Sequence, residues 1–266
     1  MVRTLTNGFA SGRIAQGFML TGVRGVGKTT TARLIARALN YGDKPTIDMP
    51  GYGPHCEAIL ESRHLDVIEM DAASNTGVDN MREIIDSVRY APVQARYKVY
   101  IIDEVHMLSK SAFNALLKTL EEPPPHVKFL FATTEVEKLP VTVLSRCLQF
   151  NLRPMAPETV LEHLTRVLAS ENVPAEVQAL RLLARSARGS MRDALSLADQ
   201  AIAFGSGQLQ EAAVRLMLGS VDRSHVMGLI DALAKGDGAA VVAISEGLRL
   251  NGLSAASALE DMSMVL

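Results

Sequence analysis

The sequence predicts an α/β fold: a parallel five-stranded sheet with a glycine-rich loop, then a small helical domain and the start of a second all-α domain. Three observations support this fold class. Apolar strand-like runs alternate with amphipathic helical patterns between residues 18 and 151. A glycine-rich loop at 22–29 joins the first run to a helical segment. From residue 157 onward the patterns are helical only, so the chain divides into a sheet domain and helical domains.

The elements of the sheet domain follow from the apolar runs. The predicted strands are 18–21, 64–70, 97–102, 127–132 and 148–151, and the predicted helices are 29–39, 78–88 and 111–120. The strand at 97–102 is almost continuously apolar, which is typical of a sheet covered on both faces. Residues 41–55 are rich in Gly and Pro, and we expect a loop there rather than a packed element.

The second half of the chain is divided by proline and glycine. Helices are predicted at 157–170, 175–187, 190–203 and 208–218, with breaks at Pro174, Gly189 and 205–207. The expected domains are a nucleotide-binding domain at 1–154, a helical lid at 155–220 and the start of a helical oligomerisation (collar) domain at 221–266.

Both ends of the sequence lie inside helical patterns. Val2, Leu5 and Phe9 recur at helical spacing at the start. At the other end a pattern breaks off that comprises Leu259, Met262, Met264 and Leu266. We expect a piece of a longer polypeptide, truncated at both ends, in which Met1 need not be the natural start.

Composition sets limits on partners and location. The formal net charge of −2 gives no overall basic footprint for nucleic acid, although a ring of subunits can still present a local positive patch. Cys56 and Cys147 are the only cysteines, which suits a reducing compartment without disulfides. No apolar run is long enough to span a bilayer and no signal peptide opens the chain. These features predict a cytoplasmic protein without a membrane partner.

The glycine-rich loop reads Gly-Val-Arg-Gly-Val-Gly-Lys-Thr, which fits the pattern G-x-x-x-x-G-K-[ST] of P-loop nucleotidases. Its glycines allow backbone N–H groups to surround phosphate oxygens. Lys28, expected to face solvent, would place a charge near the β- and γ-phosphates, and Thr29 would offer a hydroxyl to Mg²⁺. A structural glycine turn is the alternative, which the strand–loop–helix setting disfavours. The residues expected to bind ATP and Mg²⁺ are Gly22, Val23, Arg24, Gly25, Val26, Gly27, Lys28, Thr29, Thr30 and Asp103.

A pair of acids follows the strand at 97–102. At the end of a buried strand beside a P-loop, Asp103 is placed to hold the Mg²⁺ shell and Glu104 to orient the attacking water. The alternative is a pair of solvated strand-end acids. His106 is close enough to suggest acid–base chemistry, but Glu104 is better placed, and we expect a structural role for His106.

Other candidates come from the ends of elements. Parallel strands end at one sheet edge, so Thr133 or Thr134 should face the γ-phosphate. Ser190 is a plausible N-cap that puts Arg192 in the first turn of a helix, where a cation suggests a nearby anion. A surface arginine is the alternative for Arg192. Arg146 precedes the strand at 148–151 and should therefore lie at the opposite edge from the P-loop.

Taken together, these motifs resemble the AAA+ clamp-loader ATPases of the bacterial DNA polymerase III gamma/tau family, nearly from end to end. Besides the P-loop, the matching stretches are 71–74 (DAAS), 102–108 (IDEVHML), 114–124 (NALLKTLEEPP), 144–147 (LSRC) and 189–195 (GSMRDAL). The resemblance implies that Thr134 is sensor 1, Arg192 the sensor 2 arginine of the lid, and Arg146 a finger given to a neighbouring subunit. It also implies a hetero-pentameric ring of loader subunits that opens a sliding clamp and places it on primer-template DNA.

The sequence departs from the family in two places. The opening segment, which in the family contacts adenine, is missing. Many relatives also have four zinc-binding cysteines after the P-loop helix, and the corresponding positions are Tyr41, Pro50, Gly53 and Cys56. One thiolate cannot form a tetrahedral site, and His55 could add only an adjacent ligand, so no zinc is expected.

Two other functions compete with an ATP-driven clamp-loader motor. One is another AAA+ machine, such as a branch-migration helicase or an unfoldase, which the stretch at 144–147 disfavours. The other is a non-hydrolysing scaffold subunit, which the intact Lys28, Thr29, Asp103 and Glu104 disfavour. The sequence shows no acidic triad for nucleotidyl transfer. A DNA polymerase (transferase) activity would therefore belong to the whole polymerase III assembly and not to this chain.

Overall fold

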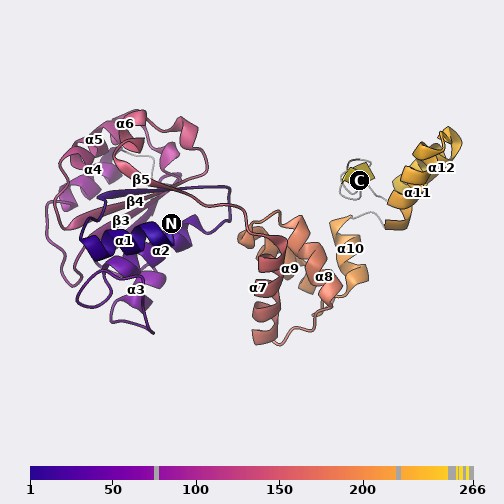
Figure 1. The fold of residues 1–266 in the computed structure, drawn as a ribbon, viewed down its shortest axis with the longest axis horizontal. Helices are drawn as coiled ribbons and strands as arrows, with labels where there is room; N and C mark the ends of the chain where they lie inside the picture. Colours follow the sequence, from indigo (N-terminus) through magenta and orange to yellow (C-terminus); the bar gives the residue numbers. More distant parts are fainter. Residues whose placement is uncertain (75–77, 220–222, 251–255, 257, 260–261, 264–266) are drawn as a thin grey trace. The chain divides into compact units, whose positions relative to one another are not determined.

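The computed structural model describes residues 1–74, 78–219, 223–250, 256, 258–259 and 262–263 (Figure 1). The chain forms two compact units, Met1–Pro154 and Met155–Leu266, which are described separately. The last residue of the predicted lid, residue 220, and residues 221–222, Met264 and Leu266 of the predicted collar domain lie outside the described residues.

The first unit contains a parallel sheet in the order β2-β3-β4-β1-β5. Its strands are β1 (Gly17–Thr21), β2 (Val67–Asp71), β3 (Lys98–Asp103), β4 (Val127–Thr133) and β5 (Cys147–Asn151). Its helices are α1 (Val2–Ser11), α2 (Lys28–Leu39), α3 (Cys56–Leu60), α4 (Val78–Ser87), α5 (Lys110–Glu121) and α6 (Val141–Leu144), with the short 3₁₀ helices η1 (Val105–Met107) and η2 (Val136–Lys138). The predicted parallel α/β sheet is confirmed.

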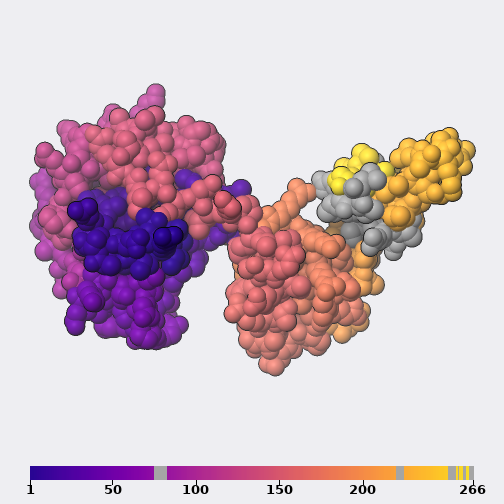
Figure 2. Space-filling model, viewed as in Figure 1, coloured from indigo at the N-terminus to yellow at the C-terminus, as the bar shows by residue number. Residues whose placement is uncertain are grey.

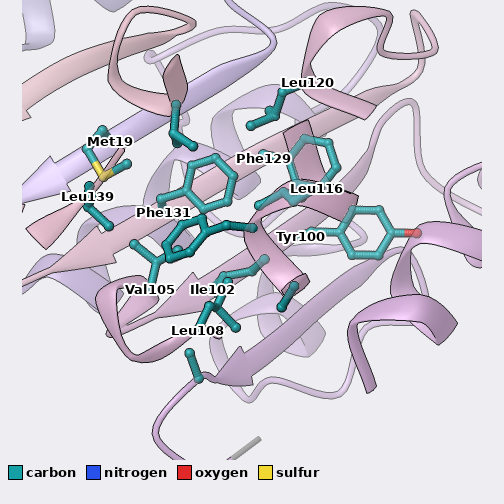
Figure 3. Close-up of a cluster of buried hydrophobic side chains, with 14 of the residues drawn as sticks. Met19, Tyr100, Ile102, Val105, Leu108, Leu116, Leu120, Phe129, Phe131 and Leu139 are labelled. Carbon is teal, nitrogen blue, oxygen red and sulfur yellow. The ribbon is translucent and has the colours of Figure 1, made fainter. Parts of the chain in front are cut away.

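Apolar side chains leave the sheet on both faces and form two cores. Alternate residues of β4 point to opposite sides: Phe129 and Phe131 enter one core, and Leu130 and Ala132 the other. The first core contains Leu116 of α5 (Figure 3). The second is covered by α1, α2 and α3, and α1 lies at the surface of the unit (Figure 2, indigo). Every residue of β4 is buried, as expected for a central strand.

The structure corrects two expectations about local structure. Helix α3 directly follows the Gly/Pro-rich loop, where no helix was predicted. Strand β2 begins at Val67 rather than at residue 64. The reason is a polar turn: His64 Nδ1 accepts from the N–H of Asp66, and the buried Asp66 carboxylate accepts from the backbone N–H groups of 93–95 at 2.7–2.8 Å. These bonds and the backbone bond from the Val67 N–H to the His64 carbonyl hold residues 64–66 in a turn, so the regular strand begins at Val67.

The second unit is helical. Helices α7 (Pro157–Ser170), α8 (Val177–Ser186), α9 (Met191–Phe204) and α10 (Glu211–Leu218) share one core, which includes Leu164 and Leu183. Helices α11 (Arg223–Ala234) and α12 (Gly238–Leu250) pack on each other around Val226 and Leu248. Within the described residues, no helix combines the length and the apolar character needed to cross a bilayer.

Candidate nucleotide site

The P-loop is a tight turn between β1 and α2 that needs glycine at specific positions. Gly22 has φ 146°, and a Cβ added there would lie 2.5 Å from the carbonyl oxygen of Leu152. Gly27 has φ 94° and occupies the cap position before α2. A side chain at either position would be strained, so the turn depends on glycine. The N-terminus of α2 therefore points its backbone N–H groups into the loop, an arrangement that favours anions.

Lys28 does not face solvent, contrary to the expectation from sequence. Its side chain is buried, with 6% of the residue exposed. The ammonium Nζ donates to the carbonyl oxygens of Gly22 (3.0 Å) and Val23 (3.2 Å), both in the same loop. The loop thus folds around its own cation. Val23, Arg24 and Thr30 are exposed, whereas Val26 is buried.

Thr29 and Asp103 form the second part of the site. The Thr29 hydroxyl donates to Asp103 Oδ2 at 2.5 Å, although the two residues are far apart in sequence. Asp103 is the last residue of β3 and Thr29 lies in the first turn of α2. A hydroxyl and a carboxylate are the oxygen ligands that Mg²⁺ prefers, so these residues fit the cation that accompanies ATP.

Glu104 turns sharply away from the end of β3. Its backbone has φ 45° and ψ 46°, in the left-handed region that non-glycine residues rarely adopt. Its N–H donates to Asp103 Oδ1 at 2.9 Å. Its carboxylate Oε2 accepts from the Thr134 hydroxyl (3.0 Å) and the Thr134 N–H (3.2 Å). The Glu104 carboxylate is thereby held at the same edge of the sheet as Asp103 and Thr134.

The strand order explains how these residues meet. Strand β4 lies between β1 and β3, with Thr133 paired to Thr21 at the end of β1. Thr133 is fully buried, whereas Thr134, the next residue, is exposed. Of the two threonines that the sequence left open, Thr134 is the one that contacts Glu104.

Arg146 lies at the other end of the strands. It immediately precedes β5, whose first residue, Cys147, pairs with Gly17 at the start of β1, while the P-loop follows the end of β1. The Arg146 guanidinium Nη2 pairs with Glu121 Oε1 at 2.9 Å, and Nη1 donates to the Thr142 carbonyl at 2.7 Å. Strand β1 thus separates Arg146 from the P-loop of the same chain.

Arg192 belongs to the second unit. The Ser190 side chain accepts from the N–H of Asp193, so Ser190 caps α9 as predicted. Arg192 is exposed in the first turn of that helix. It is not in the same compact unit as the P-loop.

Four positions correspond to zinc-binding cysteines in many relatives. Three of them hold residues without a thiol, and the residues at these positions contact one another. The Tyr41 hydroxyl donates to the Pro50 carbonyl at 2.8 Å, and the Gly53 N–H donates to Cys56 Sγ at 3.2 Å. A Cβ on Gly53 would lie 3.0 Å from the Tyr41 ring. His55 and His64 form a hydrogen bond, in which His55 Nδ1 and His64 Nε2 are 2.9 Å apart. The described residues include no group of three or more His, Cys, Asp or Glu side chains suited to a metal ion. Of the four positions, Cys56 alone carries a side chain of the kind that binds zinc.

Sequence reasoning missed a polar cluster beside Glu104. His106 Nδ1 lies 2.9 Å from the Thr133 hydroxyl, and its Nε2 lies 3.2 Å from a carboxylate oxygen of Glu135. Glu135 also pairs with Lys138. The only signal in the sequence was the position of His106 just after the two acids, which does not reveal partners on another strand.

Comparison with known proteins places the chain among DNA polymerase III subunits. Residues 1–156 match the family model described as DNA polymerase III, delta subunit. Residues 159–207 match the DNA polymerase III clamp loader subunit, ATPase lid domain, and residues 209–265 match DNA polymerase III subunits gamma and tau domain III.

Curated relatives match along nearly the whole chain. DNA polymerase III subunit tau of Escherichia coli K12 is 48% identical over 98% of this chain and 41% of its own length. DNA polymerase III subunit gamma of Buchnera aphidicola subsp. Schizaphis graminum is 41% identical over 100% of this chain and 73% of its own length. The chain thus spans well under half of the tau relative.

A solved structure of the RuvB Holliday junction branch migration motor from Thermotoga maritima has a similar fold. It superposes with a TM-score of 0.59 at 19% identity, covering 94% of this chain and 78% of that one. A similarity at this level of sequence identity shows a shared fold and no more. The curated relatives above have more than twice this sequence identity to the chain.

Proposed function

The chain belongs to the family of DNA polymerase III gamma and tau subunits, and on this premise we propose that it binds and hydrolyses ATP as a motor subunit of the clamp loader. The observation that carries this proposal is the meeting of Lys28, Thr29, Asp103 and Glu104 at one edge of the sheet. A scaffold subunit that does not hydrolyse ATP would have no need for this set.

Each residue of the site has a proposed task. The N–H groups of the P-loop and the Lys28 ammonium bind the phosphates, and Thr29 and Asp103 hold Mg²⁺. The cation neutralises charge on the β- and γ-phosphate oxygens when it is bound. Glu104 orients the attacking water, and Thr134, as sensor 1, holds the Glu104 carboxylate through its hydroxyl and N–H.

Two arginines complete the proposed mechanism from elsewhere. Arg146 acts on the nucleotide of the neighbouring subunit, a role supported by its place at the sheet edge opposite to its own P-loop. Arg192 in the lid contacts the nucleotide as sensor 2.

The proposed partners are the other loader subunits in a hetero-pentameric ring, the sliding clamp and primer-template DNA, in the cytoplasm. The motor loads the clamp onto primed DNA during DNA replication. The DNA polymerase activity in the family's name belongs to other subunits of that assembly.

The test is ATP turnover by the full-length protein assembled with its loader partners. A clamp loader should be stimulated by the clamp and primed DNA together. Stimulation by DNA alone would favour a branch-migration motor, and the absence of turnover would favour a scaffold subunit.

A further inference from the structure

His106 is a buried ionisable side chain at the nucleotide edge that the proposed mechanism does not use. It lies in η1, and its side chain is only 6% exposed. Its neighbours Val105 and Leu108 are anchored in the core below the sheet edge (Figure 3). The imidazole is therefore held on a short, rigid element, and burial requires a partner for each ring nitrogen.

Both ring nitrogens of His106 have polar partners. Nε2 faces Glu135. A hydrogen bond to Lys138 lowers the pKa of the Glu135 carboxyl, and this carboxyl is therefore ionised at neutral pH. A carboxylate only accepts hydrogen bonds, so Nε2 carries the proton. The Thr133 hydroxyl accepts from the N–H of Glu135 at 3.0 Å and lies 2.9 Å from His106 Nδ1, so it links the imidazole to the segment after β4.

This cluster joins the ends of two strands. His106 follows β3, whereas Thr133 and Glu135 stand at the end of β4. Thr134, the donor to the Glu104 carboxylate, lies between those two anchored residues. The same Glu104 oxygen is 3.4 Å from His106 Nδ1. Glu104 itself is in a left-handed backbone conformation, which is unfavourable for a non-glycine residue and persists only where the surroundings hold it.

We propose that His106 is a positioning residue for ATP hydrolysis. Through Nδ1 it fixes the Thr133 hydroxyl, and thereby the segment that carries Thr134, at the place where Thr134 binds the Glu104 carboxylate. The inference rests on the proposed role of Glu104 in orienting water. His106 transfers no proton to or from the substrate in this scheme.

The two ring nitrogens can be tested separately. His106→Asn keeps a polar group near the position of Nδ1 and so can still reach Thr133, whereas His106→Gln reaches toward the position of Nε2 and Glu135 only. His163→Asn, in α7 of the second unit, serves as the matched control. ATP turnover is measured in the loader assembled from full-length subunits, and nucleotide affinity is measured by titration with a fluorescent ATP analogue.

We expect His106→Gln to lower kcat by about tenfold or more and His106→Asn to stay within about threefold of wild type, with nucleotide affinity changed less than about twofold in both. Thr133→Val removes the partner hydroxyl and should reproduce the loss in kcat. Combined with His106→Gln it should add little, because both changes break one contact. In crystals of the nucleotide-free protein, the 3.0 Å contact from Thr134 to Glu104 should be lost in His106→Gln and kept in His106→Asn.

Wild-type turnover in His106→Gln would overturn the proposal. So would equal losses in the Asn and Gln variants, or a loss that appears in nucleotide affinity or thermal unfolding instead of kcat, since these indicate a general structural role. Glu104→Gln is measured in parallel. If that variant turns over normally, the role given to Glu104 fails, and this result is distinct from any result at His106.

Discussion

Lys28 combines two tasks in one side chain, because its ammonium binds the loop's own carbonyl groups at the place where phosphates are expected. We expect Lys28→Ala to abolish ATP binding, since the phosphates lose their nearest cation. Because Lys28 is buried, the change should also lower the free energy of unfolding, by about 1–3 kcal/mol. Isothermal titration with ATP and chemical denaturation measure the two effects. ATP binding at wild-type affinity would contradict the assignment.

Glu104→Gln separates binding from hydrolysis. The amide keeps the shape of the side chain and can still accept from Thr134, and Asp103 and Thr29 are untouched. Nucleotide affinity should therefore stay near wild type, while hydrolysis falls by about 10²-fold or more because the carboxylate that orients water is lost. Single-turnover kinetics of the assembled loader would show this, and hydrolysis at the wild-type rate would exclude the role.

Motif spacing could predict individual residues whose chemistry depends only on the sequence segment in which they lie. Lys28, Thr29, Asp103 and Glu104 were predicted in this way, and their roles stay predictions. The burial of Lys28 depends on how the loop closes, which spacing does not encode. The contact between His106 and Thr133 joins residues 27 positions apart, so it became visible only in three dimensions.

Among the elements, long apolar runs were predictable and short polar turns were not. The strands of the sheet follow from their apolar residues, and α7 begins and ends where its pattern indicates. Helix α3 has five residues, too few to give a periodic signal. The start of β2 was placed too early because the side chains of His64 and Asp66, rather than apolarity, determine the backbone there.

The turn before β2 should make the sheet unit sensitive to acid. Burial, followed by the neighbouring His55, lowers the pKa of His64 against the opposing effect of Asp66. The unfolded chain, with a histidine pKa of about 6.5, then binds a proton that folded His64 does not, so stability falls as the pH drops below about 6.5. Burial alone would raise the pKa of the Asp66 carboxyl, but three backbone N–H groups together lower it below its ordinary value. Asp66 therefore adds a further loss of stability only below about pH 4.

Amide hydrogen exchange of β2 and of residues 93–95 measures this local stability. Between about pH 7 and pH 5.5, after correction for intrinsic exchange rates, protection should fall in the wild type and fall less in His64→Asn. The asparagine keeps an acceptor for the Asp66 N–H but does not titrate. His163→Asn should behave as wild type, and an identical pH dependence in His64→Asn would refute the assignment.

The loop between α2 and α3 should keep its shape without a metal ion. We predict that the purified protein contains no stoichiometric zinc, because three of the four expected thiolates are replaced by Tyr41, Pro50 and Gly53. Tyr41→Phe should lower stability by at most about 1 kcal/mol, since the bond to Pro50 is solvent-exposed. Elemental analysis after dialysis against a chelator decides the question, and one retained zinc per chain would contradict it.

At the scale of the whole molecule, Arg146 should work between subunits. In mixed rings, a subunit with an intact site next to an intact Arg146 should turn over even when that arginine comes from a Lys28→Ala subunit. Arg146→Ala should instead silence the site of its neighbour, by about 10³-fold or more. Turnover is measured in rings of defined composition. If Arg146→Ala silences only the site of its own subunit, the role between subunits is wrong.

The division into a sheet unit and helical segments was visible in the sequence, but the order of the strands was not. Chain order runs β1 to β5, whereas β4 pairs with both β1 and β3 in the sheet. Apolar runs indicate that a strand is central, and they do not indicate its neighbours. The contact between Thr134 and Glu104 depends on that neighbourhood.

The central place of β4 has a consequence for mutational tolerance. Phe131 pairs with Met19 of β1 on one side and with Ile102 of β3 on the other, so one strand sets the register of both halves of the nucleotide site. Deleting a single residue from β4 would send every following side chain to the opposite face and move Thr134 away from Glu104. In a scan of all positions, insertions and deletions in β4 should be the least tolerated of the sheet, although none of its buried residues touches nucleotide in the proposed mechanism.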